Sequence, residues 1–249
     1  MRMRTSVQTV AASPEFILEA IRDSHRHECA FDPEADPSVE LCFETSVAEW
    51  RDACDLVRTE KLGEALNEIW SIDVSPAAWR TVLEPARRRT LRDVCDLISA
   101  RAKRAIIQPA GVFDASCRPA GTFLAVRALL LKAGAQENSI RPSQPIAEVA
   151  RRHPGIFLGP ISRLVPGRLP TVVIRTPLHD AAVWTIILAF IVALATVSLY
   201  PTLALGAFAV GVLAGVAART LSRRPPRAVQ FGQIITFRDL AETLAGEDA

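Results

Sequence analysis

AAVWTIILAFIVALATVSL (residues 181–199) and TLALGAFAVGVLAGVAA (residues 202–218) make up the longest apolar stretch of this 249-residue chain. A helix of about 20 apolar residues crosses a bilayer core, so the stretch is long enough for two spans. Tyr200 and Pro201 separate the two segments, and a proline ends a helix. The sequence therefore predicts a two-helix transmembrane hairpin over residues 181–218. A buried helical hairpin in a globular core is the alternative.

The residues around this stretch predict the orientation of the hairpin. Aromatic rings favour the membrane interface, and basic residues collect on the cytoplasmic side. The expected membrane-interface residues are Trp184, Tyr200, Arg175, Arg219, Arg223 and Arg224. We therefore expect an integral protein of the bacterial inner membrane with both termini in the cytoplasm. The five cysteines show no paired spacing, which agrees with reduced thiols in that compartment.

Two glycines in the second segment predict close helix packing. Gly211 and Gly215 form a GxxxG motif, which lets helix backbones approach each other. The partner is either the first helix of the same hairpin, which we favour, or a second copy of the chain. Neither segment contains an ionisable side chain of the kind that transporters use, so the hairpin is expected to act as an anchor.

The rest of the chain divides by charge into three further parts. Residues 1–100 carry 12 Lys/Arg against 19 Asp/Glu and are expected to form an acidic helical domain. Residues 101–180 carry 12 against 4 and are expected to form a basic helical segment beside the membrane. Residues 219–249 are expected to be a cytoplasmic tail with a short strand and a helix. The basic segment would suit anionic lipid, although the acidic and basic parts could equally pack against each other.

The predicted fold class is mainly α with minor β. Ser13, Ser46, Ser75 and Thr90 precede apolar helical patterns and are typical N-cap residues. A further helix is expected over residues 122–133, and Gly134 would end it. Residues 39–43 alternate as in a short strand. Residues 155–170 are rich in glycine and proline and are expected to form an apolar loop.

Two short β-prone runs flank the apolar stretch. They are TVVIR at 171–175 and QIIT at 233–236. If they pair with each other, the hairpin is an insertion into a small fold.

Two segments of the chain are similar to each other. Residues 90–98 (TLRDVCDLI) and 236–244 (TFRDLAETL) both place Thr, an apolar residue, Arg and Asp before an apolar helix. The pattern is that of an N-capped amphipathic helix. It indicates either an internal repeat or a chance recurrence of a common helix start.

Residues 63–70 (GEALNEIW), 72–74 (IDV) and 90–93 (TLRD) together resemble the second half of an acyl carrier protein. Residues 123–143 are similar to the first helix and loop of that family, and residues 236–244 to its last helix. The family attaches phosphopantetheine to a serine in an Asp-Ser-Leu motif, which this chain lacks. The resemblance therefore implies a small helical fold and does not imply acyl carriage.

Motifs for catalysis and metal binding are weak. The chain contains no GxSxG, Walker, GxGxxG or HExxH motif. His25 and His27 lie about 200° apart on a helix and cannot chelate one ion together, so a solvated helix end is expected rather than a metal site. Cys117 with His153 is the one nucleophile pair left open. No cofactor is expected.

These observations favour a binding function. Hydrophobic residues make up 49% of the chain and its net charge is only +2, which excludes a disordered chain and a strongly basic nucleic-acid binder. The expected function is that of a membrane-anchored adaptor whose partners are the lipid bilayer and a protein partner or a homodimer, without nucleic acid. The alternative is an accessory enzyme or carrier-like protein acting on acyl or lipid substrates.

Overall fold

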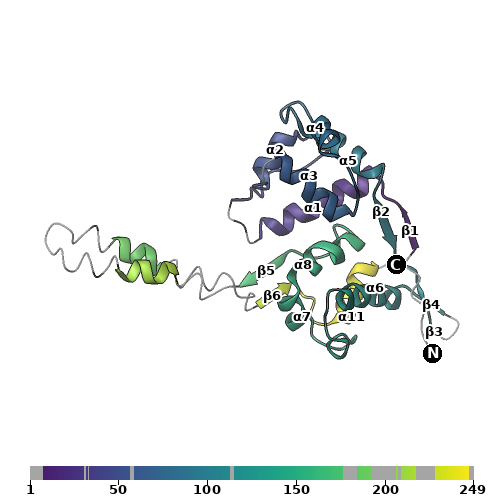
Figure 1. Ribbon diagram of the computed structural model, residues 1–249. Coiled ribbons are helices and arrows are strands. Elements are labelled where there is room, and N and C mark those ends of the chain that lie inside the picture. The colour runs from purple at the N-terminus through teal and green to yellow at the C-terminus, as the bar shows by residue number, and fades with distance from the viewer. Residues whose placement is uncertain are drawn as a thin grey trace. The chain divides into compact units, whose positions relative to one another are not determined.

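The computed structural model describes residues 8–30, 32, 34–56, 59–112, 115–175, 184–191, 194, 206, 209–216 and 228–246 (Figure 1). These residues belong to two compact units. Unit 1 combines residues 1–173 with residues 230–249, and unit 2 consists of residues 174–229. The fold is mainly helical with short two-stranded sheets, which agrees with that part of the prediction.

The predicted transmembrane hairpin is wrong. Among the described residues, no helix is long and apolar enough to cross a membrane. The longest described helical runs of unit 2 are residues 184–191 and 209–216, with eight residues each. The same finding contradicts the predicted placement as an integral protein of the bacterial inner membrane with cytoplasmic termini.

The structure describes only part of the residues predicted for a membrane interface. Trp184 begins a described helical run of unit 2, and its side chain is 70% exposed. Arg175 is the last residue of strand β5 (Val172–Arg175), and its side chain lies outside the described part of the structure. Tyr200, Arg219, Arg223 and Arg224 also lie outside the described residues.

The two glycines of the GxxxG motif face the other helical run of unit 2. A Cβ atom built on Gly211 would lie 3.5 Å from Cβ of Ala189, which is 8% exposed. A Cβ atom on Gly215 would lie 3.9 Å from Cδ1 of Ile186. Both glycines therefore lie against a neighbouring helix of the same chain. Most of the large apolar side chains around them are exposed.

The first part of unit 1, which we call the first lobe, contains five helices and one two-stranded sheet among its described residues. Its elements are β1 (Gln8–Ala11), α1 (Pro14–Glu28), α2 (Val47–Ala53), α3 (Thr59–Trp70), α4 (Pro76–Leu83), α5 (Leu91–Ser99) and β2 (Lys103–Ile106). The hydroxyl groups of Ser13, Ser46 and Ser75 accept hydrogen bonds from the first turns of α1, α2 and α4, as predicted. β1 and β2 are antiparallel, with Gln8 opposite Ile106. Residues 39–43 form no strand, although Leu41 is buried.

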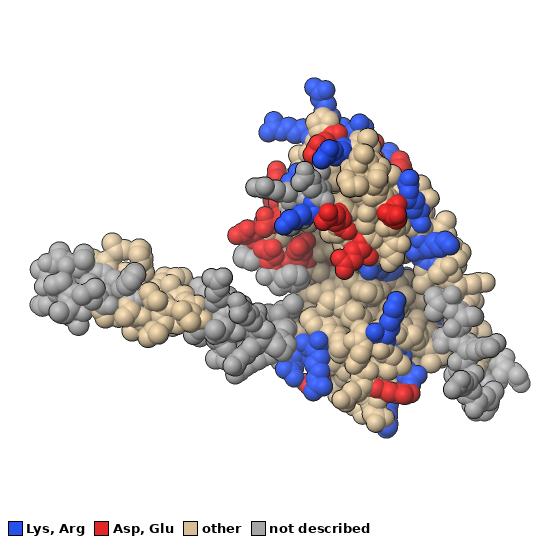
Figure 2. Space-filling model, viewed as in Figure 1, with Lys and Arg blue, Asp and Glu red and all other residues tan. Residues whose placement is uncertain are grey.

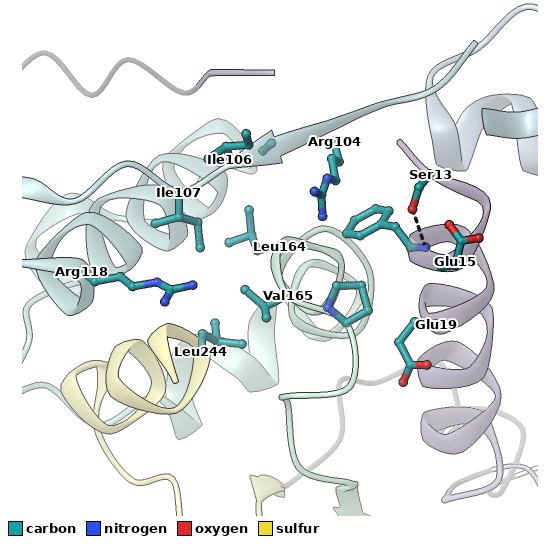
Figure 3. Close-up of a pocket in the computed structure, with 13 residues that line it drawn as sticks. Ser13, Glu15, Glu19, Arg104, Ile106, Ile107, Arg118, Leu164, Val165 and Leu244 are labelled. Atoms are coloured by element: carbon teal, nitrogen blue, oxygen red, sulfur yellow. Dashed lines mark hydrogen bonds between the residues drawn. The ribbon is translucent and has the colours of Figure 1, made fainter. Parts of the chain in front are cut away.

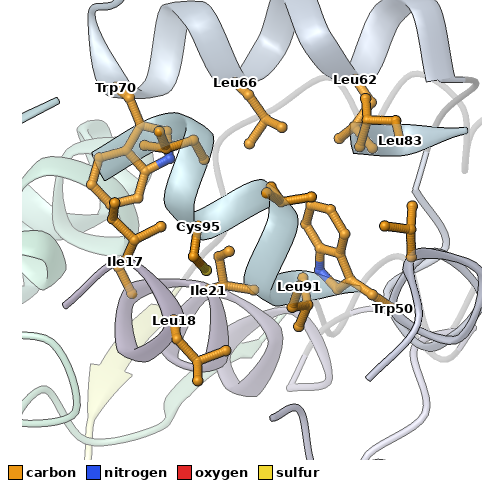
Figure 4. Close-up of a cluster of buried hydrophobic side chains, with 14 of the residues drawn as sticks. Ile17, Leu18, Ile21, Trp50, Leu62, Leu66, Trp70, Leu83, Leu91 and Cys95 are labelled. Atoms are coloured by element: carbon orange, nitrogen blue, oxygen red, sulfur yellow. The ribbon is translucent and has the colours of Figure 1, made fainter. Parts of the chain in front are cut away.

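The core of the first lobe lies between α1, α3 and α5 (Figure 4). Ile17 of α1 and Leu91, Val94 and Ile98 of α5 are completely buried. Their i, i+3 and i+7 spacing places one apolar face of α5 against α1. Trp50, Trp70 and Trp79 are 5%, 9% and 3% exposed and belong to this core.

The second lobe consists of residues 110–173 and 230–246 of unit 1. Its described elements are β3 (Ala110–Val112), β4 (Ala115–Cys117), α6 (Arg118–Lys132), η1 (Glu137–Ser139), α7 (Ala147–Arg152), α8 (Pro154–Ile156), η2 (Phe157–Ile161), η3 (Ser162–Leu164) and α11 (Phe237–Ala245). α11 packs against α6, and Phe237 lies edge-on to Phe123 with the ring centroids 6.5 Å apart. The predicted loop over residues 155–170 is wrong for 154–164, which forms helical turns because Phe157 and Ile161 are buried in this core.

A pair of strands marks the junction between unit 1 and unit 2. β5 pairs with β6 (Ala228–Phe231) in a two-stranded sheet. The predicted partner of β5, residues 233–236, follows β6 instead. There Ile234 forms an isolated bridge with Phe231, and Thr236 forms one with Pro145.

The two similar segments, residues 90–98 and 236–244, make matching backbone hydrogen bonds at the starts of α5 and α11. In the first lobe the N–H groups of Leu91 and Arg92 donate to the carbonyl oxygens of Thr45 and Phe43, at 2.9 and 3.0 Å. In the second lobe the N–H groups of Phe237 and Arg238 donate to the carbonyl oxygens of Gln144 and Pro142, at 3.1 and 2.8 Å. The reverse bonds are Val47 N–H to Arg89 O and Ile146 N–H to Ile235 O. In each lobe, backbone hydrogen bonds thus join the start of the last helix, α5 or α11, to the segment before α2 or α7. The bonded residues are spaced identically along the chain within each of these segments.

The side chain of Asn67 connects α3 to the turn that follows it. Its amide group donates to Val74 O (2.9 Å) and accepts from Val74 N–H (3.1 Å) and Trp79 Nε1 (3.1 Å). We expect Asn67→Ala to lower the free energy of unfolding by about 2 kcal/mol, because two part-buried donors lose their acceptor. Denaturant unfolding of the full chain measures this change. The matched control is Asn138→Ala in η1, where the side chain is exposed, and an equal loss in both variants would contradict the prediction.

Candidate functional site

An apolar pocket of about 300 Å³ lies between α1, α2, α3 and η2 of unit 1. Its walls are mainly apolar side chains of the first lobe, namely Ile21, Trp50, Cys54, Leu56, Leu62, Leu66, Ile69 and Trp70. Figure 4 labels Ile21, Trp50, Leu62, Leu66 and Trp70 among them. The second lobe contributes Leu158, Gly159, Ser162 and Arg163. Volumes of about 300 to 1,000 Å³ with mostly apolar walls and a few polar groups are typical of small-molecule sites.

The pocket follows α1 from Ala20 to Glu28. Eight residues of helix correspond to about 12 Å. Trp70 marks one end, because its ring lies 6.3 Å from that of Phe16 in the first turn of α1. Cys54 marks the other end, where the charge of Glu28 acts on its thiol. The cavity is therefore elongated and has two distinct ends.

Acidic side chains surround the end of the pocket at Glu28. Burial raises the pKa of Glu28, and the nearby carboxylates of Asp32 and Asp55 raise it further. Burial also raises the pKa of Cys54 to about 12, so this thiol stays protonated and belongs to the apolar wall. Figure 2 shows acidic side chains gathered on one flank of the first lobe.

The opposite end of the pocket contains a cation. The Arg163 guanidinium lies 5.8 Å from the centroid of the Trp70 ring, within the range of a cation–π contact. Burial lowers the pKa of Arg163, but arginine remains charged in proteins. The pocket therefore has a positive end at Arg163 and a negative end at Glu28.

A buried polar cluster joins α1 to the segment that carries Arg163. Asp23 is 2% exposed, and its carboxylate accepts hydrogen bonds from Ser162 Oγ and from Arg26. Arg26 also donates to the carbonyl oxygen of Leu169. His27 Nε2 lies 3.7 Å from Oδ2 of Asp23. These contacts fix residues 162–169 of the second lobe on α1 of the first.

The predicted solvated helix end at His25 and His27 is wrong. The two side chains are 7% and 2% exposed, and His25 Nε2 lies 3.0 Å from the carbonyl oxygen of Asp36. Within the described part of the chain, no group of three or more His, Cys, Asp or Glu side chains could hold a metal ion. His25 instead lines the apolar pocket.

Sequence reasoning missed the pocket itself. Arg163 lies in the basic part of the chain, residues 101–180, and Trp70 ends the apolar helical pattern of residues 63–70. Neither position by itself indicates a binding site. The i, i+4 and i+8 spacing of Ala20, Ser24 and Glu28 on one face of α1 was the available signal. It could not be interpreted without knowing that residues 158–163 lie opposite that face.

A second hollow, a groove of about 660 Å³, lies between the start of α1, β2, η3 and α11 (Figure 3). Glu15 and Glu19 project into it from α1, and Arg104 and Arg118 from β2 and α6. Its floor contains Leu164, Val165 and Leu244 among other apolar side chains. Unlike the apolar pocket, the groove is open to solvent, and charges of both signs line it.

Comparison with known proteins gives no match: no family model fits the sequence, and neither a curated protein nor a solved structure is similar to it. The resemblance to acyl carrier proteins therefore stays a prediction. The class of the protein is defined here by its own features, which are a two-lobed helical unit and an elongated apolar pocket.

The Asp23 cluster should make stability depend on pH in the acid range. Burial acts to raise the pKa of Asp23, but the interactions with His27, Ser162 and Arg26 outweigh it, so the pKa is lowered overall. A carboxylate whose pKa is lower in the folded state stabilises the fold above its unfolded pKa. That stabilisation is lost as the pH falls through the folded value, below about pH 4.

We therefore expect Asp23→Asn to have a lower melting temperature than wild type at pH 7. The difference in melting temperature between the two should become smaller as the pH approaches 3. Thermal unfolding followed by circular dichroism between pH 3 and 7 measures both effects. Asp73→Asn, at an exposed position outside the helices, is the control and should change little. A gap between Asp23→Asn and wild type that stays constant over this range would refute the assignment.

Proposed function

We propose that this protein is a binding protein that takes the apolar chain of a small molecule into the pocket between α1, α2, α3 and η2. The observation that supports this function most directly is a cavity of about 300 Å³ that follows α1 from Ala20 to Glu28 and whose walls are mainly apolar. Filling it removes the apolar surface of a ligand from water, which contributes about 25 cal/mol per Å². This function corresponds to the carrier-like alternative, without a covalent attachment site.

Binding is favoured over catalysis by the state of the polar groups around the pocket. The Cys54 thiol is protonated and buried, so it is a poor nucleophile. Asp23 is already engaged by Ser162 and Arg26, and His25 by the Asp36 carbonyl. These side chains hold the structure together and are not arranged around a reacting atom.

Decanol is a suitable uncharged probe, because a chain of about ten carbons suits a pocket of this length and volume. We expect the full chain to bind decanol, with a change in tryptophan fluorescence because Trp50 and Trp70 line the pocket. Ser24 is exposed and lines the pocket, so Ser24→Phe should weaken binding at least tenfold by filling it.

The control for this experiment is Ser116→Phe in β4, which places the same ring at an exposed position outside the pocket. It should bind decanol like wild type. Isothermal titration calorimetry gives the dissociation constants. Equal binding by Ser24→Phe and wild type, or no binding by the wild-type chain, would contradict the proposed function.

The groove in Figure 3 favours a second candidate function, that of an adaptor for a protein partner. Four consecutive residues, 104–107, line it, so β2 and its continuation run along one wall. Within the described strands, β2 pairs with β1 alone. An extended peptide can add to such a strand through main-chain hydrogen bonds, and the apolar floor can take alternate side chains.

A displayed library of random peptides tests the adaptor function. We expect selection on the full-length protein to enrich peptides that share a pattern, and Ile107→Asp to reduce their binding at least tenfold because it places a charge on the apolar wall. Thr81→Asp, on the exposed face of α4, is the control. If the selected peptides bind Ile107→Asp and wild type with equal affinity, the groove is excluded as their binding site.

A further inference from the structure

We propose that Arg163 binds an anionic head group, so that the ligand of the apolar pocket is a single-chain anionic amphiphile. This inference rests on the proposed function, because it names the chemistry of the molecule that enters the same pocket. It follows from the position of one cation, from the charges at the opposite end and from the dimensions of the cavity.

Arg163 is a partly buried cation without a counter-charge. Nothing in the described structure places a carboxylate within ion-pair distance of its guanidinium, and burial is the sole cause of its lowered pKa. Its nearest cation-stabilising contact is the Trp70 ring, at 5.8 Å. A charge that has lost water without gaining a partner is unfavourable. An anion at this position would provide that partner through charge-assisted hydrogen bonds to the planar guanidinium.

The neighbouring aspartate does not supply this counter-charge. Asp23 accepts from Ser162, the residue before Arg163, but its charge is already paired with Arg26. The same hydrogen bond fixes the backbone next to Arg163 on α1. The cation is therefore held at the wall of the pocket, and its charge remains available to a ligand.

The opposite end of the pocket determines the orientation of the ligand. Burial raises the pKa of Glu28 there, and the neighbouring carboxylates of Asp32 and Asp55 raise it further. An anionic head group would be repelled at that end and attracted at Arg163. The apolar chain then extends along α1 toward Cys54 and Leu56, which present an uncharged wall.

The dimensions of the pocket favour a single chain. Its volume of about 300 Å³ lies at the lower limit for ligand sites. The lining face of α1 from Ala20 to Glu28 corresponds to about 12 Å of helix. One extended chain of about ten carbons is compatible with both values, whereas a lipid with two chains is not.

A series of probes with the same ten-carbon chain and different head groups tests this inference on the full-length protein, below the micelle concentration of each probe. The probes are decanoate, decyl phosphate, decanol and decyltrimethylammonium. We expect the anionic probes to bind at least tenfold more tightly than decanol, and decyltrimethylammonium to bind more weakly than decanol. The ratio of decanoate to decyl phosphate affinity distinguishes a carboxylate from a phosphate monoester.

Two variants assign the effect to Arg163. Arg163→Met keeps the length and apolar stem of the side chain, and it should bind decanoate and decanol about equally. Arg163→Lys keeps the charge and should retain part of the preference for anions. Thermal unfolding of each variant without ligand shows that the fold is intact. The inference is supported if Arg163→Met loses the preference for anionic probes while Arg163→Lys keeps part of it.

The possible failures are distinguishable. If decanol and decanoate bind equally to wild type, or if Arg163→Met keeps the preference for anions, the inference about the head group is overturned and the proposed function stands. If none of the probes binds, both the inference and the proposed function are wrong.

Discussion

In both lobes the same set of backbone hydrogen bonds joins the start of the last helix to an earlier segment of the lobe. The arrangement of the other elements depends on this closure of each lobe. The N–H groups of Leu91 and Phe237 donate to Thr45 and Gln144. These donors lie at the start of α5 and α11, where a helix leaves its first N–H groups without an internal acceptor. Asp93 and Asp239 accept from the N-cap N–H groups at 3.1 and 2.8 Å. Each closure thus satisfies donors that would otherwise need water, and it brings the last helix of the lobe against the first.

This closure explains why the pocket lies where it does. Because α5 packs on the face of α1 that contains Ile17, Leu18 and Ile21, that face belongs to the core of the first lobe. Ile21 also lines the pocket, together with Ala20, Ser24 and Glu28 on the same side of α1. The second lobe covers this side with residues 158–163 and is anchored there by the Asp23–Ser162 hydrogen bond. The pocket is the space that remains between two well-packed lobes.

The elements that the sequence predicted correctly are those that local chemistry determines. Ser13, Ser46 and Ser75 begin helices because a hydroxyl group can accept from an N–H two or three residues ahead, whatever the rest of the chain does. Residues 154–164 form helical turns against their composition, because burial of Phe157 and Ile161 outweighs weak local propensity. The hairpin prediction failed for a related reason. A hydropathy pattern measures the preference of a segment for an apolar environment, but it does not by itself determine the secondary structure of that segment.

The candidate site was not predictable, because its chemistry depends on which residues lie next to each other. Arg163 belongs by sequence to a basic stretch, and a basic stretch is usually a solvated surface. The structure places it against Trp70, which is more than 90 residues earlier in the chain, and gives it no carboxylate partner among the described residues. His25 and His27 show the same limit in the opposite direction, since polar residues near a helix end are buried by segments distant in sequence. An arginine and a tryptophan are each unremarkable in a sequence. A partly buried arginine over a tryptophan at one end of an apolar cavity, with carboxylates at the other, is a pattern that only the folded chain can present.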